Sequence, residues 1–291
     1  MIKIYSNSKY FELIVQALNY LFTRYNKSIS EDKHILWSIT NKINLSSNDI
    51  YILFNPHNIN PMPKKYIIYN FEQLQVITTW DISNFESDYW TKLKNAWQVW
   101  DYSLTNIEYL KNTHNIDAMF LPLGWSPTMK NINFKSTLWS ERINTIMFIG
   151  LMNEKRRDFL KPIHTLCKSM NYNMFLSNKC WDFEYINICS ITKIAINIHY
   201  YSGSTILEVH RIIPLILSDI WIISERSNDR WYDDLFNDII DWIDINTCCS
   251  KIEEIILLDP ETVNIELKNR KRKLIERCDY LKFWIDSNIK I

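Results

Sequence analysis

The stretch IKIYSNSKYFELIVQALNYLFTRY, residues 2–25, predicts a β-strand, a polar turn and an α-helix in succession. The strand is a short apolar run, and the helix carries apolar side chains at helical spacing from Phe11 to Leu21. The same order returns in INTIMFIGLMNEKRRDFLKPIHTL, residues 143–166. Two halves that begin alike predict two similar α/β lobes.

Further strand-type segments follow each of these openings, with helical patterns between them. They are DIYILF (49–54), KYIIYNF (65–71), QVWDYS (98–103), AMFLPL (118–123), KIAINIHY (193–200) and IWIISE (220–225). Strands that alternate with helices predict parallel sheets covered by helices on both faces. The expected fold is therefore α/β, with two Rossmann-like lobes.

A polar segment without periodicity, residues 128–140, separates the two halves. We place an N-terminal lobe at residues 1–130 and a C-terminal lobe at residues 141–291, the second ending in a long helical region from about Pro260. A single large α/β domain is the alternative.

The composition is that of a globular protein, with 47% apolar and 23% charged residues among 291. Basic and acidic side chains number 33 each, so no overall field attracts nucleic acid or an anionic membrane. No signal peptide pattern and no apolar window long enough for a membrane span occur, so we expect a soluble, cytoplasmic protein. The six cysteines form no C-x-x-C pair and are expected to be reduced and mostly buried.

One basic run stands out, KNRKRKLIER at residues 268–277. It could bind nucleic acid, but its helical pattern and the acidic residues elsewhere favour a solvated helix face. We therefore expect no nucleic-acid partner.

Residues that directly follow strands are the candidate site residues, because ligands of doubly wound sheets bind beyond the carboxyl ends of the strands. In the second half these are residues 150–157, 199–204 and 224–226. Neither G-x-G-x-x-G nor G-x-x-x-x-G-K-[ST] is present, which argues against a dehydrogenase or an NTPase.

Gly150 ends its strand, and the following LMNEKRR enters a helix. Free amides at a helix N-terminus bind anions, so Arg156 and Arg157 at this entrance could neutralise a phosphate. The alternative is that both arginines are solvated surface charges.

The stretch HYYSGSTILEVHR, residues 199–211, holds one of only three glycines in the chain. Gly203 is expected to let the backbone approach a ligand or take a positive φ, with a neighbouring serine capping a helix behind it. In that helix Glu208 would accept hydrogen bonds from a vicinal diol such as a ribose, while Arg211 orients the carboxylate or reaches a phosphate. A surface ion pair between the two is the alternative.

Several segments resemble glycosyltransferases of the GT-B fold, particularly short ones carried by large DNA viruses. In the second half these are FIGLMNEKRR (148–157), KIAINIHYY (193–201) and ILEVHRIIPLILSDIWIISE (206–225). In the first half KKYIIYNFEQL (64–74), VWDYSLTNIEYL (99–110) and MFLPLGWSP (119–127) resemble the N-terminal lobe of the same group. This chain is shorter than most of that group and lacks its glycine-rich loops.

The resemblance implies an active site between the lobes, with the nucleotide-sugar on the C-terminal lobe. By it, Glu208 matches the ribose-binding glutamate, and Arg156 or Arg157 the diphosphate contacts. Independently, the chain has no D-x-D triplet, so we expect a metal-independent enzyme that neutralises the leaving diphosphate with helix termini and basic side chains. The predicted donor-binding residues are Gly150, Asn153, Arg156, Arg157, Tyr200, Tyr201, Gly203, Ser204, Glu208, Arg211, Ser224 and Glu225.

The acceptor is assigned to the N-terminal lobe. His57, Glu72 and Asp101 each lie near a strand end there and are candidates for the general base, although a structural role is the alternative for each. The predicted function is transfer of a hexose or pentose from a nucleotide-sugar to a hydroxyl of a glycan or glycoprotein, with no cofactor beyond this co-substrate. If the protein is viral, it would act in the host cytoplasm. The alternative is a non-catalytic module that keeps the GT-B fold and binds glycan or protein.

Overall fold

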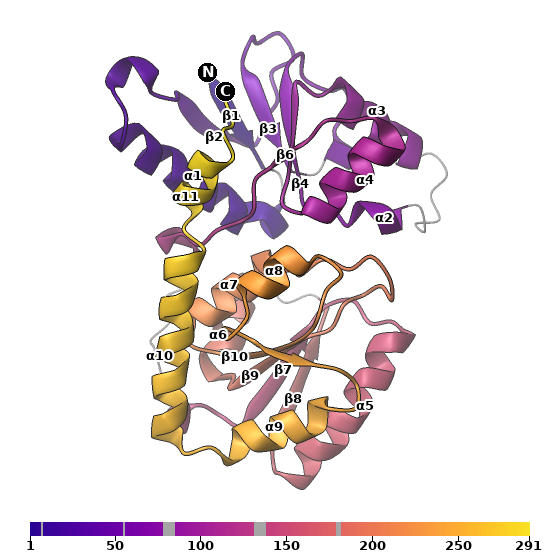
Figure 1. The fold of residues 1–291 in the computed structure, drawn as a ribbon, viewed down its shortest axis with the longest axis vertical. Coiled ribbons are helices and arrows are strands. Elements are labelled where there is room, and N and C mark those ends of the chain that lie inside the picture. The colour runs from indigo at the N-terminus through magenta and orange to yellow at the C-terminus, as the bar shows by residue number, and fades with distance from the viewer. Residues whose placement is uncertain (7, 55, 78–84, 131–137, 179–181) are drawn as a thin grey trace. The chain divides into compact units, whose positions relative to one another are not determined.

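The computed structural model describes residues 1–6, 8–54, 56–77, 85–130, 138–178 and 182–291. The chain forms two compact units (Figure 1). Unit 1 comprises residues 1–128 together with residues 278–291, and unit 2 comprises residues 129–277. Most of the polar segment predicted to separate the halves lies at residues 131–137, outside the described residues.

Unit 1 contains a six-stranded parallel sheet. Its strands are β1 (Ile2–Tyr5), β2 (Trp37–Thr40), β3 (Ile50–Leu53), β4 (Tyr66–Asn70), β5 (Gln98–Asp101) and β6 (Met119–Phe120), in the spatial order β2-β1-β3-β4-β5-β6. Its helices are α1 (Glu12–Lys27), α2 (Leu74–Ile77), α3 (Phe85–Asn95), α4 (Leu104–His114) and α11 (Tyr280–Asp286). In register, Ile4 of β1 pairs with Ile39 of β2 and Ile52 of β3.

Local sequence explains where these elements begin and end. The buried stripe of α1, which includes Ile14, Leu18 and Leu21, packs into the core of unit 1. Helix α4 begins where the Ser103 hydroxyl accepts a hydrogen bond from the amide of Asn106, and it ends at a left-handed asparagine.

The last fourteen residues return to unit 1, whereas the sequence prediction assigned them to the second lobe. The Trp125 amide donates to the carbonyl oxygen of Cys278 at 2.8 Å, and the Tyr280 and Tyr69 hydroxyls lie 3.1 Å apart. Trp284 is buried edge-on against the rings of Phe22 and Trp100. The predicted boundary was wrong here because the helical pattern is interrupted after Arg277, and the apolar side chains of α11 complete the first core.

Unit 2 contains a five-stranded parallel sheet. Its strands are β7 (Thr145–Ile149), β8 (Asn173–Ser177), β9 (Ile194–Asn197), β10 (Trp221–Glu225) and β11 (Asp241–Ile243), in the order β11-β10-β9-β7-β8. Its helices are α5 (Glu154–Ser169), α6 (Asp182–Ile191), α7 (Val209–Leu217), α8 (Arg230–Leu235), α9 (Cys248–Leu257) and α10 (Pro260–Arg277).

Both sheets have the doubly wound order in which the strand order reverses between the first and third strands of the unit. The predicted fold class, two Rossmann-like units with parallel sheets, is confirmed. In unit 2 the reversal lies between β7 and β9, and this is where a doubly wound sheet places its ligand.

The basic run lies on α10, where its side chains bind acidic groups and carbonyls of unit 2. Arg270 contacts Asp241 at 2.9 Å and Glu266 at 2.8 Å, and Lys271 contacts Asp219 at 3.1 Å. These contacts give Arg270 and Lys271 a structural role in unit 2.

Within the part of the chain that the structure describes, no helix has the length and apolar character needed to cross a membrane. The five described cysteines are free thiols, and all but Cys249 are buried.

Candidate functional site

Polar side chains of unit 2 gather at the carboxyl ends of β7, β9 and β10. Gly150 follows β7, His199 follows β9, and Glu225 ends β10. These strands are adjacent in the sheet (Figure 1). The cluster therefore occupies the point where the strand order of unit 2 reverses.

The entrance of α5 is tied to the loop after β9 by hydrogen bonds. Asn153 caps α5, its Oδ1 accepting from the amide of Arg156 at 2.9 Å, while its Nδ2 donates to the carbonyl oxygen of Tyr200 at 2.6 Å. Lys155 Nζ donates to two further carbonyls of the same loop, at 3.2 and 3.3 Å. The two strand-end loops are thus one connected structure.

Arg156 is buried, and its guanidinium binds backbone carbonyls. Nη1 donates to Leu151 at 2.6 Å, while Nε and Nη2 donate to Ile198 at 3.0 and 2.6 Å. Burial lowers the pKa of the guanidinium to about 10, against the opposing effect of Glu208. Because three of the five N–H donors are occupied and the side chain is buried, the geometry does not support the predicted phosphate contact by Arg156. Arg157 is exposed, as the solvated-charge alternative expects.

Gly150 makes room for this buried guanidinium. A Cβ at residue 150 would lie 3.0 Å from Nη1 of Arg156 and 3.2 Å from Cζ of Phe148. Gly150 is among the predicted donor-binding residues, and the group nearest to it in the structure is the protein's own arginine.

Replacing Gly150 with alanine is therefore expected to lower the free energy of unfolding by about 1–3 kcal/mol, because the new methyl group overpacks the site. Urea denaturation followed by circular dichroism measures this loss. Gly203→Ala is the matched control, since a Cβ at Gly203 would have no atom within 4 Å. Equal stability of the two variants would contradict the steric argument.

Glu208 is a buried carboxylate held through one oxygen. Its Oε2 accepts from Asn197 Nδ2 at 3.0 Å and lies 3.2 Å from Nδ1 of His199. Burial raises the pKa of Glu208, but His199, Arg211 and the Asn197 hydrogen bond outweigh burial and hold it well below its usual range. The other oxygen, Oε1, makes no hydrogen bond with any residue that the structure describes.

The helix predicted behind Gly203 begins later, at Val209, so Glu208 precedes it and Ser204 lies outside it. The positive φ falls on Ser204, at 32°, and not on Gly203. The cause is local: Thr205 donates from its amide and hydroxyl to the side-chain oxygen of Asn228, at 2.9 and 3.0 Å. These hydrogen bonds replace a first helical turn.

The predicted residues of β10 are used within the protein. Ser224, expected to border the sugar, is fully buried and accepts from Asn197 Nδ2 at 2.9 Å, so that expectation is not supported. Glu225 Oε2 accepts from Lys155 Nζ at 2.9 Å and from the His199 amide at 2.8 Å.

The two tyrosines after β9 lie near this network. The rings of Tyr200 and Tyr201 meet edge to face with centroids 5.0 Å apart. Tyr200 is 37% exposed, and its centroid lies 5.2 Å from the Arg156 guanidinium. The predicted contact of Tyr200 and Tyr201 with the donor stays a prediction.

Sequence reasoning missed three members of the cluster, Asn197, Lys155 and His199. Lys155 and His199 lie inside the strand-end stretches already selected, so position could have indicated them. Asn197 is a polar residue in a strand whose four residues are all buried, and buried polar side chains need partners.

In unit 1 the three candidate bases lie at the carboxyl ends of β3, β4 and β5. His57 Nε2 lies 3.9 Å from Oε1 of Glu72, and the His57 ring stacks on Tyr89 with centroids 4.5 Å apart. The structure therefore brings His57 and Glu72 together.

Asp101 is fully buried, and its oxygens accept from the amide of Ser103 at 2.8 Å and from the side chains of Asn70 and Asn106. Because these hydrogen bonds occupy the carboxylate, they favour the structural role of Asp101 over that of a base.

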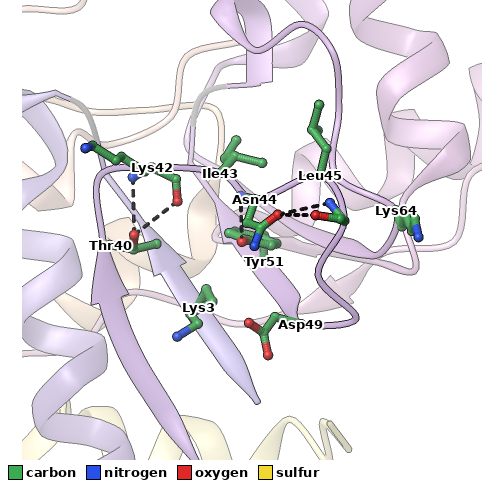
Figure 2. A pocket seen from close by; sticks show the side chains of 10 residues that line it. Lys3, Thr40, Lys42, Ile43, Asn44, Leu45, Asp49, Tyr51 and Lys64 are labelled. Atoms are coloured by element: carbon green, nitrogen blue, oxygen red, sulfur yellow. Dashed lines mark hydrogen bonds between the residues drawn. The ribbon is translucent and has the colours of Figure 1, made fainter.

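A hollow of about 920 Å³ lies elsewhere in unit 1, beside the 41–49 connection between β2 and β3 (Figure 2). Its lining includes Lys3, Lys42 and Lys64, and a single carboxylate, Asp49. None of the predicted site residues lines it.

Comparison with known proteins finds a shared fold and no close relative. No protein-family model and no curated protein matches the chain. An α-glucosyltransferase solved with UDP and a 13-mer DNA containing a HMU base has 11% identity and a TM-score of 0.56, over 98% of this chain and 97% of that one.

Two further solved structures have lower TM-scores. A glycosyltransferase from Rickettsia africae has 12% identity and a TM-score of 0.49, over 99% of this chain and 96% of that one. HepE from Anabaena, in complex with UDP and glucose, has 11% identity and a TM-score of 0.46, over 98% and 97% of the two chains. The chain has the two-lobed α/β fold of GT-B glycosyltransferases.

Proposed function

We propose that this protein is a glycosyltransferase that moves a sugar from a nucleotide-sugar to an acceptor hydroxyl without a metal ion. The observation that carries the proposal is the Glu208 carboxylate, which lies at the strand-order reversal of unit 2. Asn197 and His199 hold its Oε2, while its Oε1 makes no hydrogen bond with the described residues. A carboxylate oxygen fixed in this way can accept hydrogen bonds from the vicinal hydroxyls of a ribose.

The fold supports this proposal. The α-glucosyltransferase that shares the fold was solved with UDP, which makes a uridine nucleotide the first candidate. The diphosphate would lie toward the entrance of α5, where Arg157 is exposed. Arg211 acts electrostatically on Glu208 and would orient it or reach the same phosphates.

The acceptor would bind unit 1, with His57 or Glu72 as the base. We propose a glycan or glycoprotein hydroxyl as the acceptor. The described residues contain no group of three or more His, Cys, Asp or Glu side chains placed to hold a metal ion. Metal independence remains a proposal, which the following experiment tests directly.

A thermal-shift screen against UDP-, GDP-, dTDP- and CMP-sugars, with and without EDTA, tests the donor. A donor at about 100 times its Kd stabilises the folded protein by about 2.7 kcal/mol, which shifts Tm by several degrees. We expect one nucleotide to stand out and EDTA to make no difference. A flat response to all four nucleotides would overturn the proposal.

One observation favours a second candidate, a non-catalytic module with the same fold. The ammonium of Lys155 and the guanidinium of Arg156 are both bound to backbone carbonyls, which leaves fewer cations for a leaving diphosphate. Hydrolysis of the bound nucleotide-sugar, or its transfer to any acceptor, would exclude this candidate.

A further inference from the structure

We propose that His199 is the positioning residue for Glu208: it holds one oxygen of the carboxylate as a buried ion pair, so that the other oxygen is presented to the donor. This inference deepens the proposed function and rests on it. It adds His199, which is not among the predicted donor-binding residues. It also implies that the affinity for the donor depends on the protonation of the His199 imidazole.

Both the backbone amide and the side chain of His199 are held by carboxylates. Its side chain is 1% exposed, and its amide donates to Oε2 of Glu225 at 2.8 Å. From this anchored position Nδ1 lies 3.2 Å from Oε2 of Glu208, the same oxygen that Asn197 binds. Two groups on β9 and just after it therefore hold one carboxylate oxygen, which leaves Oε1 without a described partner.

Both imidazole nitrogens are buried without a hydrogen bond of good geometry to the described residues, and Nδ1 lies at ion-pair distance from Oε2 of Glu208, 3.2 Å. A buried polar atom without a partner destabilises the fold, so a histidine here requires compensation by another contact of the ring. The contact with Glu208 supplies it, and it does so most strongly when the imidazole carries a charge.

The charges around His199 favour its protonated form. Glu208 precedes α7, Glu225 ends β10 and Asp233 lies on α8, while Lys155 on α5 opposes them. Burial alone would lower the pKa of His199, but the carboxylates outweigh burial and raise it above 6.5.

The direction of the pH dependence follows from both partners. Because the pKa of His199 is raised on folding, its contribution to stability is complete below pH 6.5 and is lost as the pH rises through the raised value. Because the pKa of Glu208 is depressed on folding, its contribution is present above pH 4.5 and is lost on acidification. The ion pair is therefore complete between these two values and weakens toward alkaline pH.

The first measurement is the pH profile of Tm without ligand, from pH 5.5 to 9, for the wild type and the His199→Asn variant. His164→Asn is the matched control, because His164 is exposed on α5 of the same unit. We expect the wild type and the control to lose Tm toward alkaline pH relative to His199→Asn. Coincident profiles for all three proteins would show that no such ion pair forms.

The second measurement is the Kd of UDP, GDP, dTDP and CMP over the same pH range by calorimetry. For the nucleotide that binds the wild type most tightly, we expect Kd to rise about fivefold or more toward alkaline pH. In His199→Asn and in Glu208→Gln this extra pH dependence should be absent, whereas His164→Asn should retain it. Ionisation of the nucleotide itself is common to every variant and cancels in the comparison.

The outcomes separate the two proposals. If the Tm profiles show the ion pair but the wild type and His199→Asn bind the nucleotide equally at every pH, the positioning role is wrong and the donor site stands. If no nucleotide binds the wild type, the proposed function fails, and the positioning role fails with it. If His199→Asn does not fold, His199→Gln and Glu208→Gln break the same pair with less change in volume.

Discussion

Substitution of Gly124 by alanine is expected to lower the free energy of unfolding of unit 1 by about 3 kcal/mol or more. A Cβ on Gly124 would lie 2.5 Å from the carbonyl oxygen of Cys278 and 2.6 Å from Cα of Tyr280. Both contacts are with backbone atoms, which cannot rotate away as a side chain can. The returning segment at residues 278–291 would have to move, and the burial of Trp284 would be lost with it.

Hydrogen exchange measured by mass spectrometry locates this effect. Peptides from residues 278–291 and 121–126 should exchange faster in Gly124→Ala, while peptides from β7 and β9 keep their protection. Gly203→Ala again serves as the control, with no expected change beyond about 0.5 kcal/mol. If residues 278–291 kept wild-type protection in Gly124→Ala, the backbone would accommodate the methyl group without loss of stability, which would contradict the prediction.

Replacing Glu208 with alanine is expected to destabilise unit 2 by about 3–5 kcal/mol, because it breaks the buried pair and leaves His199 without its carboxylate partner. The side-chain Nδ2 of Asn197 loses one of its two acceptors at the same time and keeps Ser224. If Glu208→Ala failed to bind the nucleotide, the cause could therefore be either unfolding or the loss of the carboxylate contact. Glu208→Gln, which keeps the shape and one hydrogen-bonding oxygen, is the variant for binding experiments.

Urea unfolding at pH 6, where the ion pair is complete, measures this loss of stability. The control is Glu276→Ala, which removes an exposed partner of Arg272 on α10. Exposed pairs at this helical spacing contribute about 0.3–0.5 kcal/mol, so the control should remain close to wild type. If both variants lose the same small amount, Glu208 is not held as the structure indicates.

The architecture of both units could be predicted from the sequence because apolar periodicity reports which faces are buried. The openings at residues 2–25 and 143–166 became β1 with α1 and β7 with α5. Two short strands were not predicted. No residue of β8 is fully buried, and β11 has only three residues, so their apolar runs are too short to indicate a strand. The return of residues 278–291 to unit 1 could not be predicted, since periodicity identifies a helix but not the core on which it packs.

The sequence indicated which loops meet at the strand ends of unit 2, but not what their side chains contact. The strand-end rule selected the loops after β7 and β9, and the structure joins those loops. It could not show that the Arg156 guanidinium turns inward to carbonyls, because that direction depends on the space beside Gly150. Nor could spacing show that Thr205 and Asn228 delay the start of α7.

The return of the chain to unit 1 also bears on the order in which the protein is made. Residues 129–277 leave the ribosome before the segment that completes the first core, so unit 2 can finish folding while unit 1 still lacks α11. Until then the surfaces of Phe22 and Trp100 that Trp284 later covers remain open to solvent. The half of the protein synthesised first is thus the half completed last.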